Sequence, residues 1–424
     1  MNAQFKKGVL WSVASLVILG LGGGAINLII INMRDETALG IFNQVFALYI
    51  ILSQIGVGGI QYSTLKQISY HQDDLNSCSE ITNSALVLVA GLALIISIST
   101  IFLAEVAANF MANSEVGIGL KFVAPGLFFF ALNKVLMSTL NGLNRMRPYS
   151  IFQSLRYILL PGFVLVFILF NFTDAQLVLA LTFTEVILFL LLIIYIYRNV
   201  ILFRRIDNLF LNLRDHFNFG IRSFMSGILT ELNTRVDVLL LGYFLSDAYV
   251  GLYTFVAFIV EGVGQIAYAV RWNVDPILGD MFSKGQIELF LDNAYKIRNR
   301  AYVFIGSLGV LIIILYPILI GYVVPEIDVK VSSMVLIILM IGVVINSGYR
   351  PFIGLLLQGS KPVLHSLIMS ILVINNILLN IVLIPMFGVY GSALATSSTF
   401  VLEAFLIYYF SKAVFNLDLI LMKR

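Results

Sequence analysis

Residues 81–103 read ITNSALVLVAGLALIISISTIFL, a stretch without a single charged side chain. A run of this length and polarity is long enough to cross the hydrocarbon core of a bilayer as one α-helix. Similar runs recur along the chain, in which 60% of the 424 residues are hydrophobic and only 12% are charged. Soluble domains carry about 25% charged residues. The composition therefore predicts a membrane protein and excludes a soluble one.

The apolar runs are continuous and do not alternate with polar residues, which favours membrane helices over a β-barrel. We predict an all-α, polytopic fold of about twelve transmembrane helices. The expected spans are 9–32, 40–62, 81–103, 117–140, 150–170, 175–197, 219–243, 248–270, 300–322, 331–357, 362–385 and 389–411.

Lysine and arginine concentrate in every second connection between these spans, which predicts the orientation of the chain. With the N-terminus in the cytoplasm, the outer connections hold only Arg34, Lys121 and Lys330. The other loop cations then all lie on the cytoplasmic side. We therefore expect both termini to be cytoplasmic.

The two halves of the chain can be aligned at a shift of about 211 to 217 residues. The matching positions are Phe5 and Gly8 with Phe217 and Gly220, Leu39–Phe42 with Val250–Tyr253, Gln54 with Gln265, and Asn141–Gly142 with Gln358–Gly359. An even number of spans in each half makes the repeat parallel, with its axis along the membrane normal. We predict two six-helix lobes, residues 1–205 and 206–424, around a central cleft. Rocking such lobes opens the cleft to each side in turn, which suits a carrier.

Polar side chains follow one face of the helix predicted at 219–243. They step by four, four, three and four residues, at Arg222, Ser226, Thr230, Asn233 and Asp237. Ionisable residues inside a membrane are costly and mark functional candidates. We interpret the stripe as lining the cleft. The structural alternatives are polar helix packing and a neutralising pair of Glu231 with Arg235.

Four stretches give the chain a resemblance to a known group of transporters. They are Arg34–Phe42, the Asn141–Gly142 turn, Thr234–Gly242 and Phe387–Thr396. Together they resemble polysaccharide exporters, in particular O-antigen flippases, of the multidrug/oligosaccharidyl-lipid/polysaccharide (MOP) exporter superfamily.

The resemblance implies a flippase in a bacterial inner (plasma) membrane that serves lipopolysaccharide biosynthesis. Its substrate would be an oligosaccharide, such as an O-antigen repeat unit, linked to undecaprenyl pyrophosphate. Transport would run from the cytoplasmic to the periplasmic leaflet by alternating access. The implied partners are this lipid-linked oligosaccharide, membrane lipids, a coupling ion (H⁺ or Na⁺) and polysaccharide polymerase machinery, but no nucleic acid.

A pyrophosphate group crossing the bilayer needs positive charge, and arginine offers bidentate donors to it. The candidate substrate contacts are the cations and amides within the spans, namely Arg222, Arg235, Arg350, Lys134, Arg156, Asn233, Gln54 and Gln265. Arg156 and Arg350 lie close enough to the cytoplasm to snorkel to headgroups instead. Asp237 and Glu261 are the candidates for ion coupling, because a carboxylate in a low dielectric favours protonation. The alternative role of these two carboxylates is to form salt bridges with the cations within the spans.

The sequence does not indicate an enzyme. There is no HExxH or Walker-type motif, so no metal, nucleotide or other cofactor is expected. His71, His216 and His365 lie in or near cytoplasmic connections, where we expect them to be solvated. The remaining alternatives are a drug or cation exporter of the same superfamily and a membrane glycosyltransferase or O-antigen polymerase, although the outer loops are short for such an enzyme.

Overall fold

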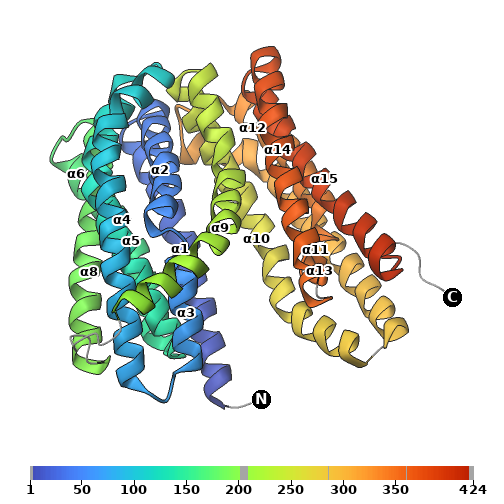
Figure 1. The fold of residues 1–424 in the computed structure, drawn as a ribbon. Coiled ribbons are helices and arrows are strands. Elements are labelled where there is room, and N and C mark those ends of the chain that lie inside the picture. The colour runs from blue at the N-terminus through green and yellow to red at the C-terminus, as the bar shows by residue number, and fades with distance from the viewer. Residues whose placement is uncertain (1–2, 201–208, 285, 360, 420–424) are drawn as a thin grey trace. The chain divides into compact units, whose positions relative to one another are not determined.

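The computed structural model describes residues 3–200, 209–284, 286–359 and 361–419. Every regular element in these ranges is a helix, which confirms the predicted all-α fold (Figure 1). Eleven of the described helices are long and apolar enough to cross a membrane. The protein is therefore a multi-pass membrane protein. Its chain divides into two compact units, residues 1–232 and 233–424.

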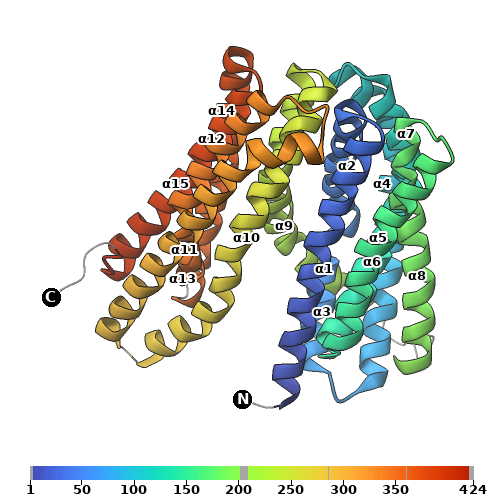
Figure 2. The same cartoon turned by 180° about the vertical axis from the view of Figure 1, so that it is seen from behind.

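The first unit is built around α5, which packs against α2, α4 and α8, and α1 lies along α6 (Figure 2). Its helices are α1 (Ala3–Met33), α2 (Glu36–Val57), α3 (Ile60–Tyr70), α4 (Leu75–Phe110), α5 (Ser114–Gly142), α6 (Met146–Leu169), α7 (Asp174–Leu177), α8 (Leu179–Val200) and most of α9 (Leu209–Phe244). The largest side chains at its centre, among them Tyr49, Leu127 and Leu136, are fully buried.

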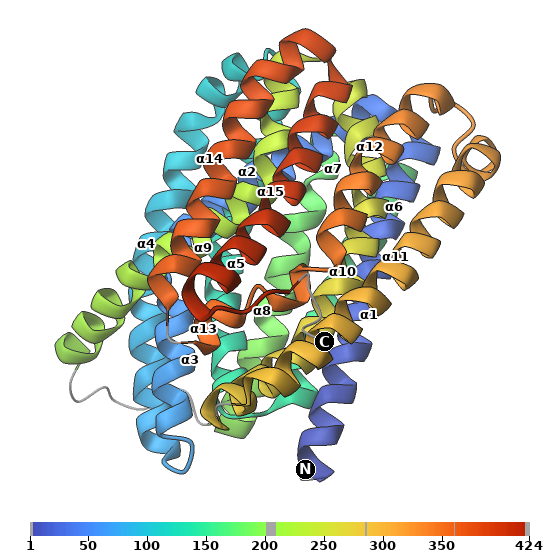
Figure 3. The same ribbon diagram turned by 90° about the vertical axis from the view of Figure 1, so that its right-hand side faces the viewer.

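In the second unit α15 packs against both α12 and α14 (Figure 3). Its elements after α9 are α10 (Asp247–Lys284), α11 (Ile287–Val323), α12 (Val329–Ser347), the 3₁₀ turn η1 (Arg350–Phe352), α13 (Leu355–Gln358), α14 (Pro362–Phe387) and α15 (Val389–Phe415).

The helix α9 corresponds to the seventh predicted span but is not one of the eleven apolar helices. Its predicted span contains the charged residues Arg222, Glu231, Arg235 and Asp237. Such a helix crosses a membrane only when protein shields these groups from lipid. With α9 added, the number of membrane helices agrees with the prediction of about twelve.

The second predicted span is interrupted, because α2 ends at Val57 and α3 begins at Ile60. Gly58 and Gly59 lie between them with φ values of 58° and 75°. This left-handed conformation is one that glycine adopts without the penalty other residues incur. The N–H of Gly58 donates to the carbonyls of Gln54 and Ile55, which closes the end of α2.

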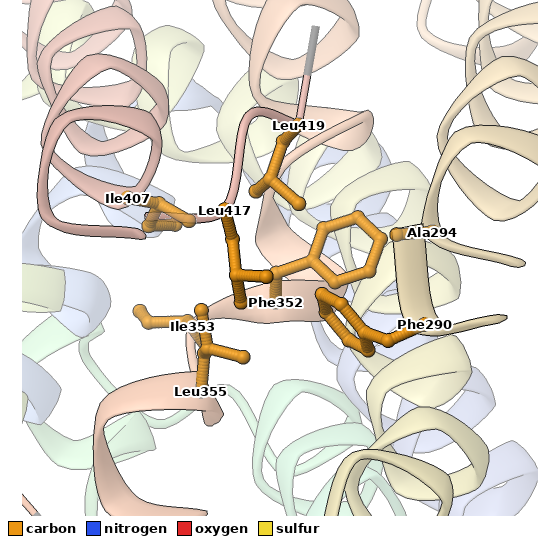
Figure 4. Packing of buried hydrophobic residues seen from close by; sticks show 8 residues of the cluster. All are labelled: Phe290, Ala294, Phe352, Ile353, Leu355, Ile407, Leu417 and Leu419. Carbon is orange, nitrogen blue, oxygen red and sulfur yellow. The ribbon is translucent and has the colours of Figure 1, made fainter. Parts of the chain in front are cut away.

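The tenth predicted span is interrupted as well, after Ser347. The chain continues through η1 and α13, and Pro351 has no N–H with which to continue the α-helical hydrogen bonds of α12. The segment that follows α15 folds back over this break, so that Leu417 and Leu419 pack on Phe352 and Phe290 (Figure 4). Arg298 of α11 donates to the carbonyl of Leu419. The broken span is thus covered by an apolar cluster of its own unit.

His216 is not the solvated histidine that the sequence suggested, since its side chain is completely buried near the start of α9. Its Nε2 lies 3.1 Å from the carbonyl oxygen of Ile81, so this nitrogen carries the proton. Its Nδ1 then accepts from the hydroxyl of Ser63 at 3.0 Å. The imidazole therefore ties α9 to α3 and α4.

Removing this imidazole should loosen the start of α9. Burial lowers the pKa of His216, which lies before the span predicted at 219–243. Below the ordinary histidine pKa of about 6.5, the unfolded chain therefore binds a proton that the folded chain excludes, and stability falls with falling pH. We expect His216→Ala to cost about 1–3 kcal/mol at neutral pH, because Ser63 and Ile81 lose their partner.

Thermal unfolding of the purified protein in detergent at pH 7.5 and pH 5.5 measures both effects. Lowering the pH from 7.5 to 5.5 should destabilise His216→Gln less than the wild type, because glutamine does not titrate. His71 is exposed, so His71→Gln is the matched control and should behave as the wild type. Equal acid sensitivity of the wild type and His216→Gln would contradict the linkage.

Candidate functional site

The four candidate residues of the first unit lie on four different helices. Gln54 on α2 is buried, Lys134 on α5 and Arg156 on α6 are partly buried, and Arg222 on α9 is exposed. Only Lys134 and Arg156 come together. Both lie over the ring of Phe130, with 5.3 Å from the ring centroid to Lys134 Nζ and 5.0 Å to Arg156 Cζ. Each distance is typical of a cation–π interaction.

Arg156 does not snorkel, because Glu185 of α8 holds it inside the unit. Its Nε lies 2.7 Å from Glu185 Oε1, and its Nη2 donates to Oε2 at 3.0 Å. The side chains are only 14% and 4% exposed. Asn133 donates to the same Oε2 at 2.8 Å. The guanidinium is therefore neutralised within its own unit.

Gln54 lies in a polar group that the sequence reading missed in part. The hydroxyl of Tyr62 interacts with the amides of Gln54 and Gln61 and lies within electrostatic range of Glu231. Tyr62 is 41% exposed. An exposed aromatic ring bordered by amides is a suitable surface for a sugar. The sequence signal was the pair of glutamines at 54 and 61, with Tyr62 directly beside the second.

Asp237 in the second unit is buried and fully engaged. Its carboxylate accepts from the N–H of Val238 at 2.9 Å and from the hydroxyl of Tyr253 at 2.8 Å. The Tyr253 hydroxyl lies 3.1 Å from the Thr396 hydroxyl. A buried acid and a buried phenol from α9 and α10 are thus linked to a partly buried hydroxyl from α15.

Three further polar residues that sequence reasoning missed lie near the start of the second unit. Asn376 donates to the carbonyl of Asn233, Asn380 donates to Asn376, and Ser392 donates to Asn380. A side chain of α14, Asn376, therefore reaches α9 through the backbone carbonyl of Asn233. Asparagines in the apolar run 362–385 were the signal that could have revealed them.

The remaining candidates of the second unit surround Glu261 on α10. Arg235, Asp237 and Arg350 lie close enough to interact electrostatically with its carboxylate. Glu261 and Gln265 are both exposed. Arg350 lies over the ring of Phe400, 5.8 Å from its centroid. The side chains of Ser226 and Thr230, which belong to the predicted stripe, are outside the described residues.

One contact recurs in both units. Asn133 of α5 donates to Glu185 of α8, and Asn346 of α12 donates to Glu403 of α15. Both pairs are buried. They differ in charge, because Glu185 has Arg156, whereas the only interaction of Glu403 within the described part of the chain is with Asn346.

Comparison with solved structures defines the class of fold. The chain resembles a lipid II flippase, MurJ, in an inward closed conformation, with a TM-score of 0.78 and 16% identity over 95% of this chain and 87% of that one. It also resembles an inward-facing multidrug resistance MATE family transporter of the MOP superfamily, with a TM-score of 0.70 and 14% identity over 95% and 97%. The protein therefore has the fold of MOP superfamily transporters.

Sequence comparison identifies the family. A model of the polysaccharide biosynthesis protein family matches residues 5–274, and the chain belongs to that family. The chain is also 30% identical over 202 residues to a probable low-salt glycan biosynthesis flippase, Agl15, of Haloferax volcanii. That alignment spans 46% of this chain and 42% of the relative.

Proposed function

We propose that the protein is a flippase that carries a lipid-linked oligosaccharide across the membrane. The observation that carries the proposal is the match to the polysaccharide biosynthesis family in a chain whose fold is that of membrane transporters. The similarity to flippases rather than to enzymes supports transport without covalent chemistry. Buried charges on several helices supply the polar groups that such a substrate needs in the bilayer.

The proposed substrate is an oligosaccharide on undecaprenyl pyrophosphate, such as an O-antigen repeat unit. Transport runs from the cytoplasmic to the periplasmic leaflet of a bacterial inner membrane, by alternating access, with both termini in the cytoplasm. Polysaccharide polymerase machinery is the proposed next partner. The substrate contacts proposed are Arg222, Arg235, Arg350, Lys134, Asn233, Gln54 and Gln265. Arg156, which the sequence also suggested, is left out because Glu185 pairs with it.

Asp237 is the proposed ion-coupling residue, with Glu261 beside it. A buried carboxylate that accepts from Tyr253 can exchange this hydrogen bond for a proton or for Na⁺. Asp237→Asn should therefore abolish the dependence of transport on an ion gradient. Transport that continues at full rate in the wild type after both the H⁺ and Na⁺ gradients have collapsed would contradict ion coupling.

Deletion of the gene tests the proposed function directly. The expected result is accumulation of lipid-linked oligosaccharide in the cytoplasmic leaflet, which purified wild-type protein in proteoliposomes should relieve by flipping the same lipid. Export of cationic drugs with no flipping of the glycolipid would identify a drug exporter instead.

A further inference from the structure

Two cations share the ring of Phe130 in the first unit, but only one of them has a carboxylate partner. Arg156 is paired with Glu185. Both oxygens of Glu185 are engaged by Arg156 and Asn133, and neither makes an ion pair with Lys134 in the described part of the chain. The two basic residues, which look equivalent in the sequence, have different surroundings in the fold.

Lys134 makes no hydrogen bond or ion pair within the described part of the chain, and its contact is the ring of Phe130. Arg156, Glu185 and Glu231 are the charged groups within electrostatic range of its ammonium. Phe130 lies one helical turn before Lys134 on α5, so the ring supports the side chain from its own helix. The ammonium therefore has three N–H donors that no acceptor in the described residues uses.

An ammonium group that makes no direct ion pair is costly inside a membrane protein, and a bound anion lowers that cost. Lysine is a common phosphate ligand that acts as a point charge and needs no fixed geometry. A cationic ligand would be repelled here, and a neutral sugar would not compensate the charge. The chemistry of this position therefore fits a phosphate or pyrophosphate group.

We infer that Lys134 binds the phosphate group of the transported lipid, and that Arg156, which is paired with Glu185, does not. The inference rests on the proposed function and divides two residues that the sequence treated alike. Lys134 contacts the substrate. Arg156 is neutralised by Glu185 and contributes no net charge to the ligand.

Binding of inorganic pyrophosphate and of farnesyl pyrophosphate to the purified full-length protein in detergent tests the assignment. Lys134→Met keeps the length of the stem and removes the charge. It should weaken binding of both probes about 10- to 100-fold, the loss expected for a charge-assisted hydrogen bond. Lys134→Arg should retain binding within a few-fold. Wild-type affinity in Lys134→Met would overturn the inference.

The matched control removes both members of the neighbouring pair. Arg156→Gln combined with Glu185→Gln leaves the net charge unchanged, so its pyrophosphate affinity should stay within about threefold of the wild type. A loss as large as that of Lys134→Met would show that Arg156 is the phosphate ligand instead. Lys134→Met should melt no lower than the wild type, because it breaks no ion pair; a large drop would indicate a structural role.

Two further measurements are needed. One distinguishes the transported lipid from ordinary membrane lipid as the ligand of Lys134, and the other tests the proposed function separately from the phosphate site. Phosphatidylglycerol in mixed micelles should compete poorly with farnesyl pyrophosphate, and equal competition would assign Lys134 to ordinary membrane lipid. Glycolipid flipping by the wild type tests the proposed function. If flipping is absent but pyrophosphate binding depends on Lys134, the proposed function fails while the anion site stands.

Discussion

Glu185→Gln should destabilise the protein by about 3–5 kcal/mol, whereas the equivalent change Glu403→Gln in the second unit should cost less than about 1 kcal/mol. Both carboxylates are buried and accept from an asparagine amide. Glutamine at 185 leaves the guanidinium of Arg156 buried without its counter-ion. Glutamine at 403 leaves no cation in the described part of the chain without its counter-ion, and the glutamine carbonyl can still accept from Asn346.

Thermal unfolding in detergent, with retention of a monodisperse gel-filtration peak, measures the contrast. Replacing the partner as well, in Arg156→Gln with Glu185→Gln, should recover most of the lost stability, because no unpaired charge then remains. The ion-pair account is wrong if the double variant is as unstable as Glu185→Gln alone. It is also wrong if the two single variants lose equal stability.

Much of the fold could be predicted because apolar length alone identifies membrane helices. Runs such as 81–103 leave the backbone no other way to satisfy its hydrogen bonds in lipid. The interruptions of two spans were harder to predict. Gly58 and Gly59 stand within an apolar run, and only their left-handed conformation ends α2. Glycine is also common inside unbroken membrane helices, so its presence alone does not predict a break.

The sequence predicts which charged residues lie within the spans, but it does not predict which of them form ion pairs with one another. The sequence showed that Lys134, Arg156 and Glu185 lie within spans, since charge in an apolar run is conspicuous. It could not show that Glu185 pairs with Arg156 and not with Lys134. That choice depends on how α5, α6 and α8 rotate against one another, which side-chain packing decides. The burial of His216 was missed for the same reason, because its partners Ser63 and Ile81 lie on other helices.

Gly59→Ala should destabilise the first unit by about 2–5 kcal/mol, combining a left-handed backbone penalty with a steric clash. The φ of Gly59 is 75°, and a Cβ there would overlap the carbonyl oxygen of Gly220 on α9 and lie 3.0 Å from the N of Phe224. A Cβ at Gly220 would in turn lie 2.8 Å from the carbonyl oxygen of Gly58. Two backbones meet here without side chains between them.

The contact links the break between α2 and α3 to α9, the helix that carries Arg222 and Asp237. Separating the backbones should therefore lower transport as well as the melting temperature. Gly91→Ala on α4 is the matched control, since a Cβ at Gly91 meets nothing within 4 Å and should leave both unchanged. Gly220→Ala tests the same contact from α9 without the left-handed penalty, so it should cost less than Gly59→Ala but more than Gly91→Ala. If Gly59→Ala and Gly91→Ala melted alike, the two backbones would not be in contact in the working protein.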